Sequence, residues 1–424
     1  MSITVDRVHA LEVLDSRSRP TLSVTLTTAG SRHVAGVPSG ASTGSGEALE
    51  LRDGDQSRYG GAGVLTAVGN VNTTINDALA GRTFADLATL DQALLDLDGT
   101  TNKSALGANA VVGVSMAAAR AFAAASDQPL WAYLTPEGVT PVLPVPHFNC
   151  LNGGMHAPNS LEWQEFMLAP LGARSMAEAV RAGADIYARL KARLSAAGFA
   201  TGLGDEGGFA PDLARPEEVL ETLVSAITDA GYTPGRDGVA IALDPAASEF
   251  YRDGAYRFAD QALSSSEMVA LYGELVDRFP IWSIEDGLAE GDWDGWVELT
   301  AELGGRIQLV GDDIFVTNPA IIADAVERKV ANAALIKVNQ IGSVTETLEA
   351  MRVCRDAGYR AMVSHRSGET PDPFIADLAV GSGFAQLKTG APARGERVAK
   401  YNRLLEIADE NPTMPYGMNG SGTA

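Results

Sequence analysis

The C-terminal two thirds of the chain repeats one pattern: a short apolar run, a polar residue at its end, and then a stretch with helical spacing. The runs are GVAIALD, FPIWSIED, IQLVGDD, AALIKVN, YRAMVSH and FAQLKTG, and the polar residues at their ends are Asp244, Glu285, Asp312, Lys337, His365 and Lys388. After a first spacing of 41 residues, these polar positions recur every 23 to 28 residues. One strand, one helix and two loops take about 25 to 30 residues. The pattern predicts an α/β fold with a C-terminal β/α barrel, whose strand-end residues meet in one site.

The N-terminal part has a mixed pattern instead. Apolar and β-branched runs at 8–17 and 21–30, bounded by turn residues, predict strands. Apolar residues at helical spacing predict helices over 64–80 and 106–126. This part is therefore expected to form an α+β domain.

A proline-rich segment separates the two patterns. Five prolines lie between Pro129 and Pro146, and repeated prolines break helices and favour extended chain. The sequence therefore predicts an N-terminal α+β domain over 1–130 and a catalytic barrel over 131–424.

Composition narrows the class of protein. The chain has 424 residues, with 32 Lys and Arg against 54 Asp and Glu, and a formal charge of -22, which argues against binding of nucleic acid or of an anionic membrane. Cys150 and Cys354 show no metal-binding spacing and are expected to be buried small side chains in a cytoplasmic protein. No signal peptide is recognisable at the N-terminus. The apolar run from Val111 to Ala125 contains Arg120 and is too short to span a bilayer.

Three carboxylates at the ends of predicted strands suggest a metal site. Asp244, Glu285 and Asp312 would repel one another at a barrel mouth. A divalent cation removes this conflict, and oxygen ligands suit Mg²⁺. The alternative is that each carboxylate caps the helix that follows it.

Two lysines follow on later strands. Lys337, inside the apolar run NAALIKVNQIG, would have its pKa lowered by burial and by a nearby cation, so that it could act as a general base. Alternatively, Lys337 could form a structural salt bridge with the three strand-end carboxylates and have no catalytic role. Lys388 would stabilise an anionic group of a substrate, unless it is an ordinary surface lysine.

Two loops contain groups that suit an anion. In SHRSGET, the side chains of Arg366 and Ser367 suit a phosphate or carboxylate, unless the motif is an ordinary turn. The Ser-, Thr- and Gly-rich loop 37–53 could be a lid that closes on such an anion, or a plain flexible loop.

Two further loops contain candidate acids and a histidine. GDEGGFAP places Glu206 between glycines, which allow close approach of the backbone to a ligand, and makes it an acid or base candidate. NGGMHAPNSLEWQEF adds His156, Gln164 and Glu165. Together with the lysines and a metal, these groups suit removal of a proton beside a carboxylate and protonation of a leaving hydroxide.

Several long motifs resemble enolases. They are SGASTG, LGANA, GDEGGFAP, ASEFY, SIED, GDD, VTNP, IKVNQIGSVTET, SHRSGET and KTGAPARGER, and they lie between LDSR near residue 15 and AKYNRLLEI ending at residue 407. The resemblance implies an N-terminal α+β domain and a barrel of the order ββαα(βα)6. It also implies a phosphopyruvate hydratase that converts 2-phosphoglycerate to phosphoenolpyruvate, with the Lys base and Mg²⁺ typical of enolase-superfamily sites.

The resemblance also implies a role for each candidate residue. Lys337 would be the base, and Glu206 the acid assisted by Glu165. The other assignments are a first Mg²⁺ on Asp244, Glu285 and Asp312, a second on Ser39, and substrate contacts from His156, Gln164, Arg366, Ser367 and Lys388, with His365 beside them. It further implies two Mg²⁺ per active site, a small anionic phosphorylated substrate and a homo-oligomer, either a dimer or an octamer.

Some positions depart from the family pattern beside these residues. Ser18 and Arg19 replace a Gly-Asn turn, Gly287 replaces a proline and Met155 replaces a serine, and the last two changes are expected to alter the pocket near the metal and His156. None removes a catalytic group. Two alternatives therefore stay open: a paralogue from phosphonate natural-product biosynthesis that makes a carboxyphosphono analogue of phosphoenolpyruvate, and a non-catalytic enolase-like binding protein.

Overall fold

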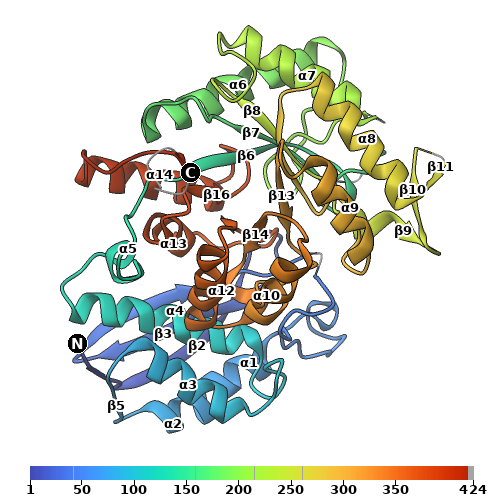
Figure 1. The fold of residues 1–424 in the computed structure, drawn as a ribbon. Helices are drawn as coiled ribbons and strands as arrows, with labels where there is room; N and C mark the ends of the chain where they lie inside the picture. Colours follow the sequence, from blue (N-terminus) through green and yellow to red (C-terminus); the bar gives the residue numbers. More distant parts are fainter. Residues whose placement is uncertain (42, 158, 214, 260, 419–424) are drawn as a thin grey trace.

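The structure is a computed structural model that describes residues 1–418 except 42, 158, 214 and 260. Figure 1 shows an N-terminal layer of sheet and helices, in blue to teal, beside a barrel formed by the rest of the chain.

The N-terminal domain is built on an antiparallel sheet in the order β2-β3-β4. Its elements are β1 (Ile3–Thr4), β2 (Arg7–Leu14), β3 (Pro20–Thr28), β4 (Ser31–Gly36), η1 (Tyr59–Gly61), α1 (Leu65–Asn70), η2 (Val71–Ile75), α2 (Asn76–Leu79), β5 (Thr83–Phe84), α3 (Leu87–Asp98), α4 (Ala108–Ala125) and α5 (Leu130–Tyr133). Helix α4 lies directly on the sheet: a Cβ at Gly113 would come within 2.5 Å of the Val24 side chain. The predicted strands and the predicted helix over 106–126 are confirmed.

The predicted helix over 64–80 is interrupted. The segment forms α1, a π-helical turn (η2) and α2. Within the π-helical turn, the Asn72 side chain accepts the Ala10 N–H at 2.7 Å and donates to the Ala10 carbonyl at 3.1 Å. Such π-helical turns insert one residue into the helical ladder, and here the turn brings an amide side chain against β2.

Helix α4 is apolar and buried. Its length and composition would allow it to cross a membrane, so the prediction that this run is too short is wrong. However, 83% of the helix is buried inside the protein, as is typical of the core helix of a soluble protein.

The barrel is closed, with the strand order β12-β13-β14-β15-β16-β6-β7-β8. The strands are β6 (Val145–Asn152), β7 (Glu165–Ala169), β8 (Ala240–Asp244), β12 (Ile281–Glu285), β13 (Gln308–Gly311), β14 (Ala333–Ile336), β15 (Arg360–Ser364) and β16 (Gln386–Lys388). All neighbours are parallel except β7, which runs antiparallel to β6 and β8. The strands are short apolar runs because both of their faces are covered.

Helices surround the barrel in the predicted order. The helical elements are η3 (Gly154–His156), α6 (Met176–Ala196), α7 (Pro216–Asp229), η4 (Ala247–Phe250), α8 (Ser265–Arg278), α9 (Trp293–Leu303), α10 (Pro319–Arg328), α11 (Val338–Ile341), α12 (Val344–Asp356), α13 (Phe374–Ser382) and α14 (Gly395–Glu410). A small sheet of β9 (Tyr251–Arg252), β10 (Ala255–Phe258) and β11 (Gln261–Leu263) precedes α8. The predicted order ββαα(βα)6 is confirmed.

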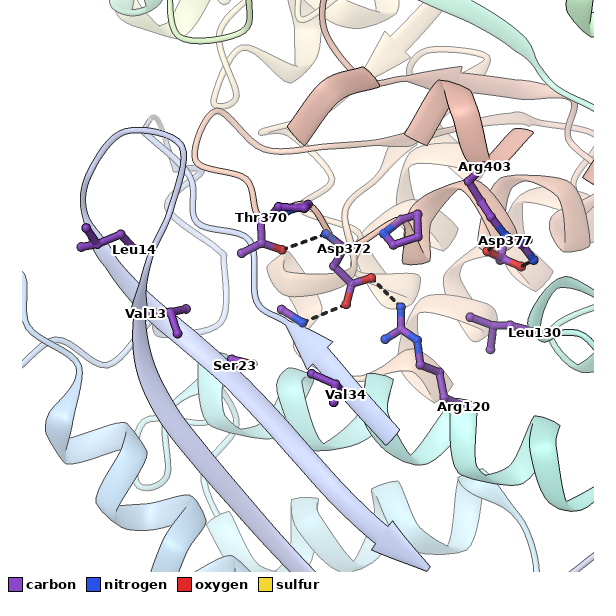
Figure 2. Close-up of a pocket in the computed structure, with 13 residues that line it drawn as sticks. Val13, Leu14, Ser23, Val34, Arg120, Leu130, Thr370, Asp372, Asp377 and Arg403 are labelled. Carbon is purple, nitrogen blue, oxygen red and sulfur yellow. Dashed lines mark hydrogen bonds and ion pairs between the residues drawn. The ribbon is translucent and has the colours of Figure 1, made fainter. Parts of the chain in front are cut away.

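The sheet of the N-terminal domain also contacts the barrel beside an open groove. Asp372 accepts a hydrogen bond from the Gly36 N–H at 2.8 Å and forms an ion pair with Arg120 of α4 (Figure 2). The groove has a volume of about 660 Å³ and is lined by Leu14, Val34 and other residues of both parts. These contacts hold the N-terminal sheet against the segment that follows the SHRSGET motif.

Candidate active site

Polar residues from the predicted pattern lie at the carboxyl ends of six barrel strands. They are Asp244, Glu285 and Lys388 at the ends of β8, β12 and β16, and Asp312, Lys337 and His365 directly after β13, β14 and β15. Glu165 joins them because it begins the antiparallel strand β7, where it is paired with Asp244. The barrel therefore gathers acids and bases from distant parts of the sequence at one end.

Lys388 is buried among the carboxylates of this end. Its Nζ lies 2.6 Å from Glu285 Oε1, 3.2 Å from Glu165 Oε1 and 3.4 Å from Asp244 Oδ2. Gln164 Nε2 donates to the same Asp244 oxygen at 3.3 Å. Burial alone would lower the pKa of Lys388, but the carboxylates, Glu165 first, raise it well above its ordinary value. Lys388 therefore stays protonated among the carboxylates of Glu165, Asp244 and Glu285.

Lys337 forms an ion pair with Asp312. Its Nζ donates to Asp312 Oδ2, while Asp312 Oδ1 accepts from Gln340 Nε2 at 2.9 Å. Burial lowers the pKa of Lys337, but the Asp312 carboxylate outweighs it and the pKa is raised above 10.5. The predicted lowering of this pKa is thus wrong as long as Asp312 bears its full charge opposite the ammonium.

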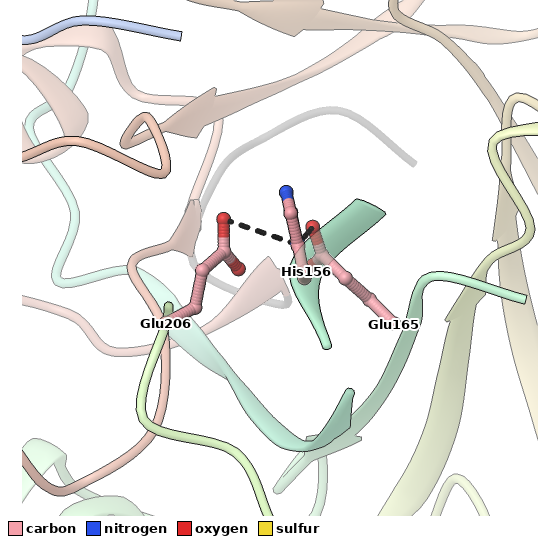
Figure 3. Close-up of side chains that lie close together, drawn as sticks. All are labelled: His156, Glu165 and Glu206. Carbon is pink, nitrogen blue, oxygen red and sulfur yellow. Dashed lines mark ion pairs between the residues drawn. The ribbon is translucent and has the colours of Figure 1, made fainter. Parts of the chain in front are cut away.

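His156 lies between two carboxyl groups, Glu165 and Glu206 (Figure 3). Its Nδ1 is 3.6 Å from Glu165 Oε1 and 3.7 Å from Glu206 Oε1, and all three side chains are buried. Burial and the charge of Glu206 raise the pKa of Glu165 well above its ordinary value. Burial opposes ionisation of Glu206 too, but His365 and His156 lower its pKa well below the ordinary value. One proton of the pair therefore resides on Glu165 and leaves Glu206 ionised.

His365 contacts the other oxygen of Glu206. Its Nε2 lies 3.2 Å from Glu206 Oε2, and Asn149 Nδ2 donates to the same oxygen at 2.9 Å. Burial lowers the pKa of His365 to about 3, so the imidazole is neutral at ordinary pH. The histidine is thus a neutral neighbour of the acid pair.

Arg366 and Ser367 bind the loop predicted as a lid. Both terminal nitrogens of Arg366 contact the Glu47 carboxylate, at 3.0 and 3.1 Å, and Arg366 also donates to Asn339 Oδ1 at 3.0 Å. Ser367 Oγ accepts the Ala41 N–H at 2.7 Å. The loop therefore lies over the site, and the Glu47 carboxylate of this loop binds the Arg366 guanidinium that was predicted to bind an anion.

Ser39 is placed differently from its predicted role as a metal ligand. Its hydroxyl donates to Glu50 Oε2 at 3.1 Å and accepts from Arg52 Nη2 at 2.8 Å. Both functions of the hydroxyl are used within the N-terminal domain. The second serine of the SGASTG motif, Ser42, lies outside the described residues.

Two groups of acidic side chains, one with a histidine, could hold a cation. Within the described residues, the ligand atoms of each group lie within 4.8 Å of one another: His156, Glu165 and Glu206 in one, and Asp286, Asp312 and Asp313 in the other.

The predicted trio of Asp244, Glu285 and Asp312 is not one of these sets, and Lys388 contacts two of its members. However, Glu285 Oε2 is buried and accepts no hydrogen bond from the described residues. Burial and the charge of Asp244 raise the pKa of Glu285 well above its ordinary value. A divalent cation would relieve both problems, and the all-oxygen donor set fits Mg²⁺.

Three residues of the site were not singled out from the sequence. Asp286 accepts the N–H groups of Asp312 and Asp313 at 2.8 and 2.9 Å and so fixes the turn after β13. Glu47 lies in the predicted lid, and Arg397 lies in the motif KTGAPARGER. Their positions in those motifs were the only available signal, because their partners are distant in sequence.

The departures from the family pattern face away from the carboxylates or toward solvent. A Cβ at Gly287 would meet Ile284 Cγ2 at 3.1 Å and the Tyr272 ring at 3.4 Å, so this position faces an apolar layer. The predicted effect of the freed backbone on the pocket stays a prediction. Met155 is 56% exposed. Ser18 has a φ of 59°, a left-handed conformation that favours the glycine found in the family pattern.

Comparison with known proteins gives matches over both parts of the chain. The family described as "Enolase, N-terminal domain" matches residues 5–134, and "Enolase, C-terminal TIM barrel domain" matches residues 140–417. A protein named Enolase from Acidothermus cellulolyticus is 55% identical over 407 residues, which cover 96% of this chain and 94% of that protein. One of the same name from Rubrobacter xylanophilus is 56% identical over 405 residues, covering 95% and 94%.

Proposed function

The chain belongs to the enolase family and is a lyase of the phosphopyruvate hydratase type, and on that premise we propose that it converts 2-phosphoglycerate to phosphoenolpyruvate with Mg²⁺. One observation above all supports the proposal. Lys337 follows β14 and Glu165 begins β7, strands that lie four apart in the ring of eight. Glu165, which assists the proposed acid Glu206, thus lies on the wall opposite the base. This arrangement suits removal of a proton from one face of a substrate and loss of hydroxide from the other.

Lys337 would take the proton α to the substrate carboxylate on its Nζ. In the contacts described above, burial favours the neutral amine and the Asp312 carboxylate opposes it. If Asp312 shared its charge with a metal, the effect of burial on Lys337 would prevail, and its amine could act as a base. Asp312 would thus couple metal binding to the activity of the lysine.

Asp244, Glu285 and Asp312 are the residues we propose to hold Mg²⁺, with the unpartnered Glu285 Oε2 as the support for this choice. The bound ion would act as a Lewis acid that stabilises the negative charge of the enolate by several kcal/mol. A second Mg²⁺ on Ser39 stays a prediction, since that hydroxyl is bonded to Glu50 and Arg52.

The pair Glu165 and Glu206 would protonate the leaving hydroxide. The opposite pKa shifts give the pair one proton, which rests on Glu165, and His156 lies between the two carboxyl groups. We propose that this proton passes from Glu165 to Glu206, which delivers it to the hydroxide that leaves as water. The pair then regains a proton from solvent, and Lys337 releases to solvent the proton that it took from the substrate. Two carboxyl groups with opposite pKa shifts are a usual arrangement for general acid catalysis.

Substrate binding would replace the Glu47 carboxylate on Arg366. A phosphate or carboxylate can accept the same two-pronged contact from the guanidinium. Ser367, Lys388, His156 and Gln164 are the remaining proposed contacts, and the exchange would tie the position of the loop to occupancy of the site. The substrate is therefore proposed to be a small phosphorylated anion.

Homo-oligomer formation, as a dimer or an octamer, is part of the proposal by analogy with the family. Neither the phosphonate paralogue nor the non-catalytic binding protein is favoured by an observation on this chain. The two-domain division at residue 130 is likewise proposed from the proline-rich segment.

The test is ³¹P NMR of the protein with Mg²⁺ and either 2-phosphoglycerate or its isomer 3-phosphoglycerate. We expect phosphoenolpyruvate to form from the 2-phospho isomer alone and formation to stop when a chelator is added. Consumption of neither isomer by the folded protein would contradict the proposal.

A further inference from the structure

Arg397, in helix α14, is completely buried and contacts two loops of the site. Its Nη1 donates to His365 Nδ1 and to the carbonyl of Arg366, both at 2.6 Å. Its Nη2 donates to the carbonyls of Ser367 at 2.6 Å and Asp205 at 3.2 Å. One guanidinium therefore joins the SHRSGET loop to the loop that contains the acid Glu206.

The contact to His365 fixes the position of a proton. A guanidinium can only donate hydrogen bonds, so His365 Nδ1 has to accept and bears no proton. The imidazole is neutral, because burial, with a smaller contribution from Arg397, outweighs the Glu206 carboxylate and lowers the pKa of His365 to about 3. The single ring proton therefore resides on Nε2, the atom that faces Glu206.

This tautomer decides how Glu206 can bind its own proton. Glu206 Oε2 accepts from Asn149 Nδ2 at 2.9 Å. The protonated Nε2 of His365 lies 3.2 Å from the same oxygen and makes no hydrogen bond to another described residue. An oxygen that already accepts one N–H and has a second N–H beside it is a poor position for a proton of its own. When Glu206 takes up the proton that rests on Glu165, this proton therefore belongs on Oε1, which points toward His156 and Glu165.

We propose that Arg397 is a positioning residue that holds His365 as the Nε2–H tautomer and thereby directs the acidic proton of Glu206 onto Oε1, toward the leaving group. The inference deepens the proposed function and rests on it. It concerns the dehydration half of the reaction and leaves proton removal by Lys337 untouched. Arg397 is argued to act through His365 and Glu206.

The test compares Arg397→Gln with Arg397→Lys. Lysine can only donate, so it preserves the tautomer, whereas the glutamine amide can present its oxygen to Nδ1 and allow the proton to move there. Arg403→Gln serves as control, because Arg403 lies on the same helix and bonds to Asp377 at 2.9 and 3.0 Å, not to the residues of the site.

The first measurement is ¹⁵N NMR of histidine-labelled protein, which has only five histidines, with His365 assigned by His365→Gln. We expect a protonated Nε2 and an unprotonated Nδ1 in the wild type and in Arg397→Lys, and a tautomer mixture in Arg397→Gln. Protonation of Nδ1 in the wild type would overturn the inference.

The second measurement separates the two halves of the reaction. In Arg397→Gln, dehydration should fall about 10²-fold, as when one positioned donor is lost, while exchange of the substrate α-proton continues at close to the wild-type rate. Equal loss of both, with a lowered melting temperature, would show a purely structural role. Absence of exchange in the wild type would instead refute the proposed function itself.

Discussion

Replacing Lys337 by methionine tests the base on which the proposed reaction depends. The change keeps the length of the side chain but removes the amine. The Lys337 and Asp312 side chains are only 11% and 9% exposed, so the variant leaves an almost buried carboxylate whose remaining side-chain hydrogen-bond partner among the described residues is Gln340. Removing one partner of a buried ion pair costs about 3 to 5 kcal/mol of stability.

The kinetic effect should exceed what this loss of stability explains. A positioned general base contributes about 10² to 10⁴ in rate, and Lys337→Met should lose this factor in exchange of the substrate α-proton with deuterated water, followed by ¹H NMR. The double variant Lys337→Met with Asp312→Asn should regain stability without regaining exchange. Lys329→Met, at an exposed lysine earlier in the chain, serves as control. Exchange at the wild-type rate in Lys337→Met would refute the assignment of the base.

Four further predictions concern the acid, the metal site, a buried aspartate of the N-terminal domain and the departures from the family pattern. In Glu206→Gln, α-proton exchange should survive while dehydration fails, and equal loss of both would contradict the division of roles. Asp312→Asn should weaken Mg²⁺ binding in calorimetry, because a carboxylate charge is lost; unchanged affinity would make Asp312 a structural residue. Burial raises the pKa of Asp91 from 3.8 to about 6, so the folded state binds the carboxyl proton more tightly than the unfolded state does. The stabilisation that this proton gives the folded state is lost as the pH rises from about 4 to about 6. Asp91→Asn should remove this pH dependence of the free energy of unfolding, which amounts to about 3 kcal/mol. The prediction would be contradicted if the difference in thermal stability between wild type and variant stayed constant between about pH 4 and 7. Gly287→Pro with Met155→Ser should leave turnover of 2-phosphoglycerate unchanged. A large increase would instead favour the hypothesis that the chain is a paralogue from phosphonate natural-product biosynthesis.

The fold was largely predictable because the barrel repeats a local pattern. Each apolar run has to be a buried strand, and the polar residue at its end has to emerge at the carboxyl end of the barrel, as Asp244 and Lys388 do. The helix over 64–80 was predicted as continuous because its π-helical turn depends on a contact between Asn72 and β2, which no local pattern reveals.

Pairings within the site could not be predicted in the same way. Glu47 and Arg366 are separated by more than 300 residues, as their positions show, and nothing around either residue indicates the other. The raised pKa of Lys337 depends on how closely Asp312 approaches it. The tautomer of His365 likewise depends on a buried arginine contributed by the last helix. Such features come from packing at ångström scale, whereas a sequence pattern specifies only which strand end a residue occupies.

The proposed reaction can be followed directly by the absorbance of phosphoenolpyruvate formed from 2-phosphoglycerate by the unmodified protein. With Mg²⁺ present, we expect turnover in the usual enzyme range of about 1 to 10³ per second, and none after chelation until Mg²⁺ is restored. A folded protein that forms no phosphoenolpyruvate with Mg²⁺, or forms it equally well in the presence of chelator, would refute the proposed function.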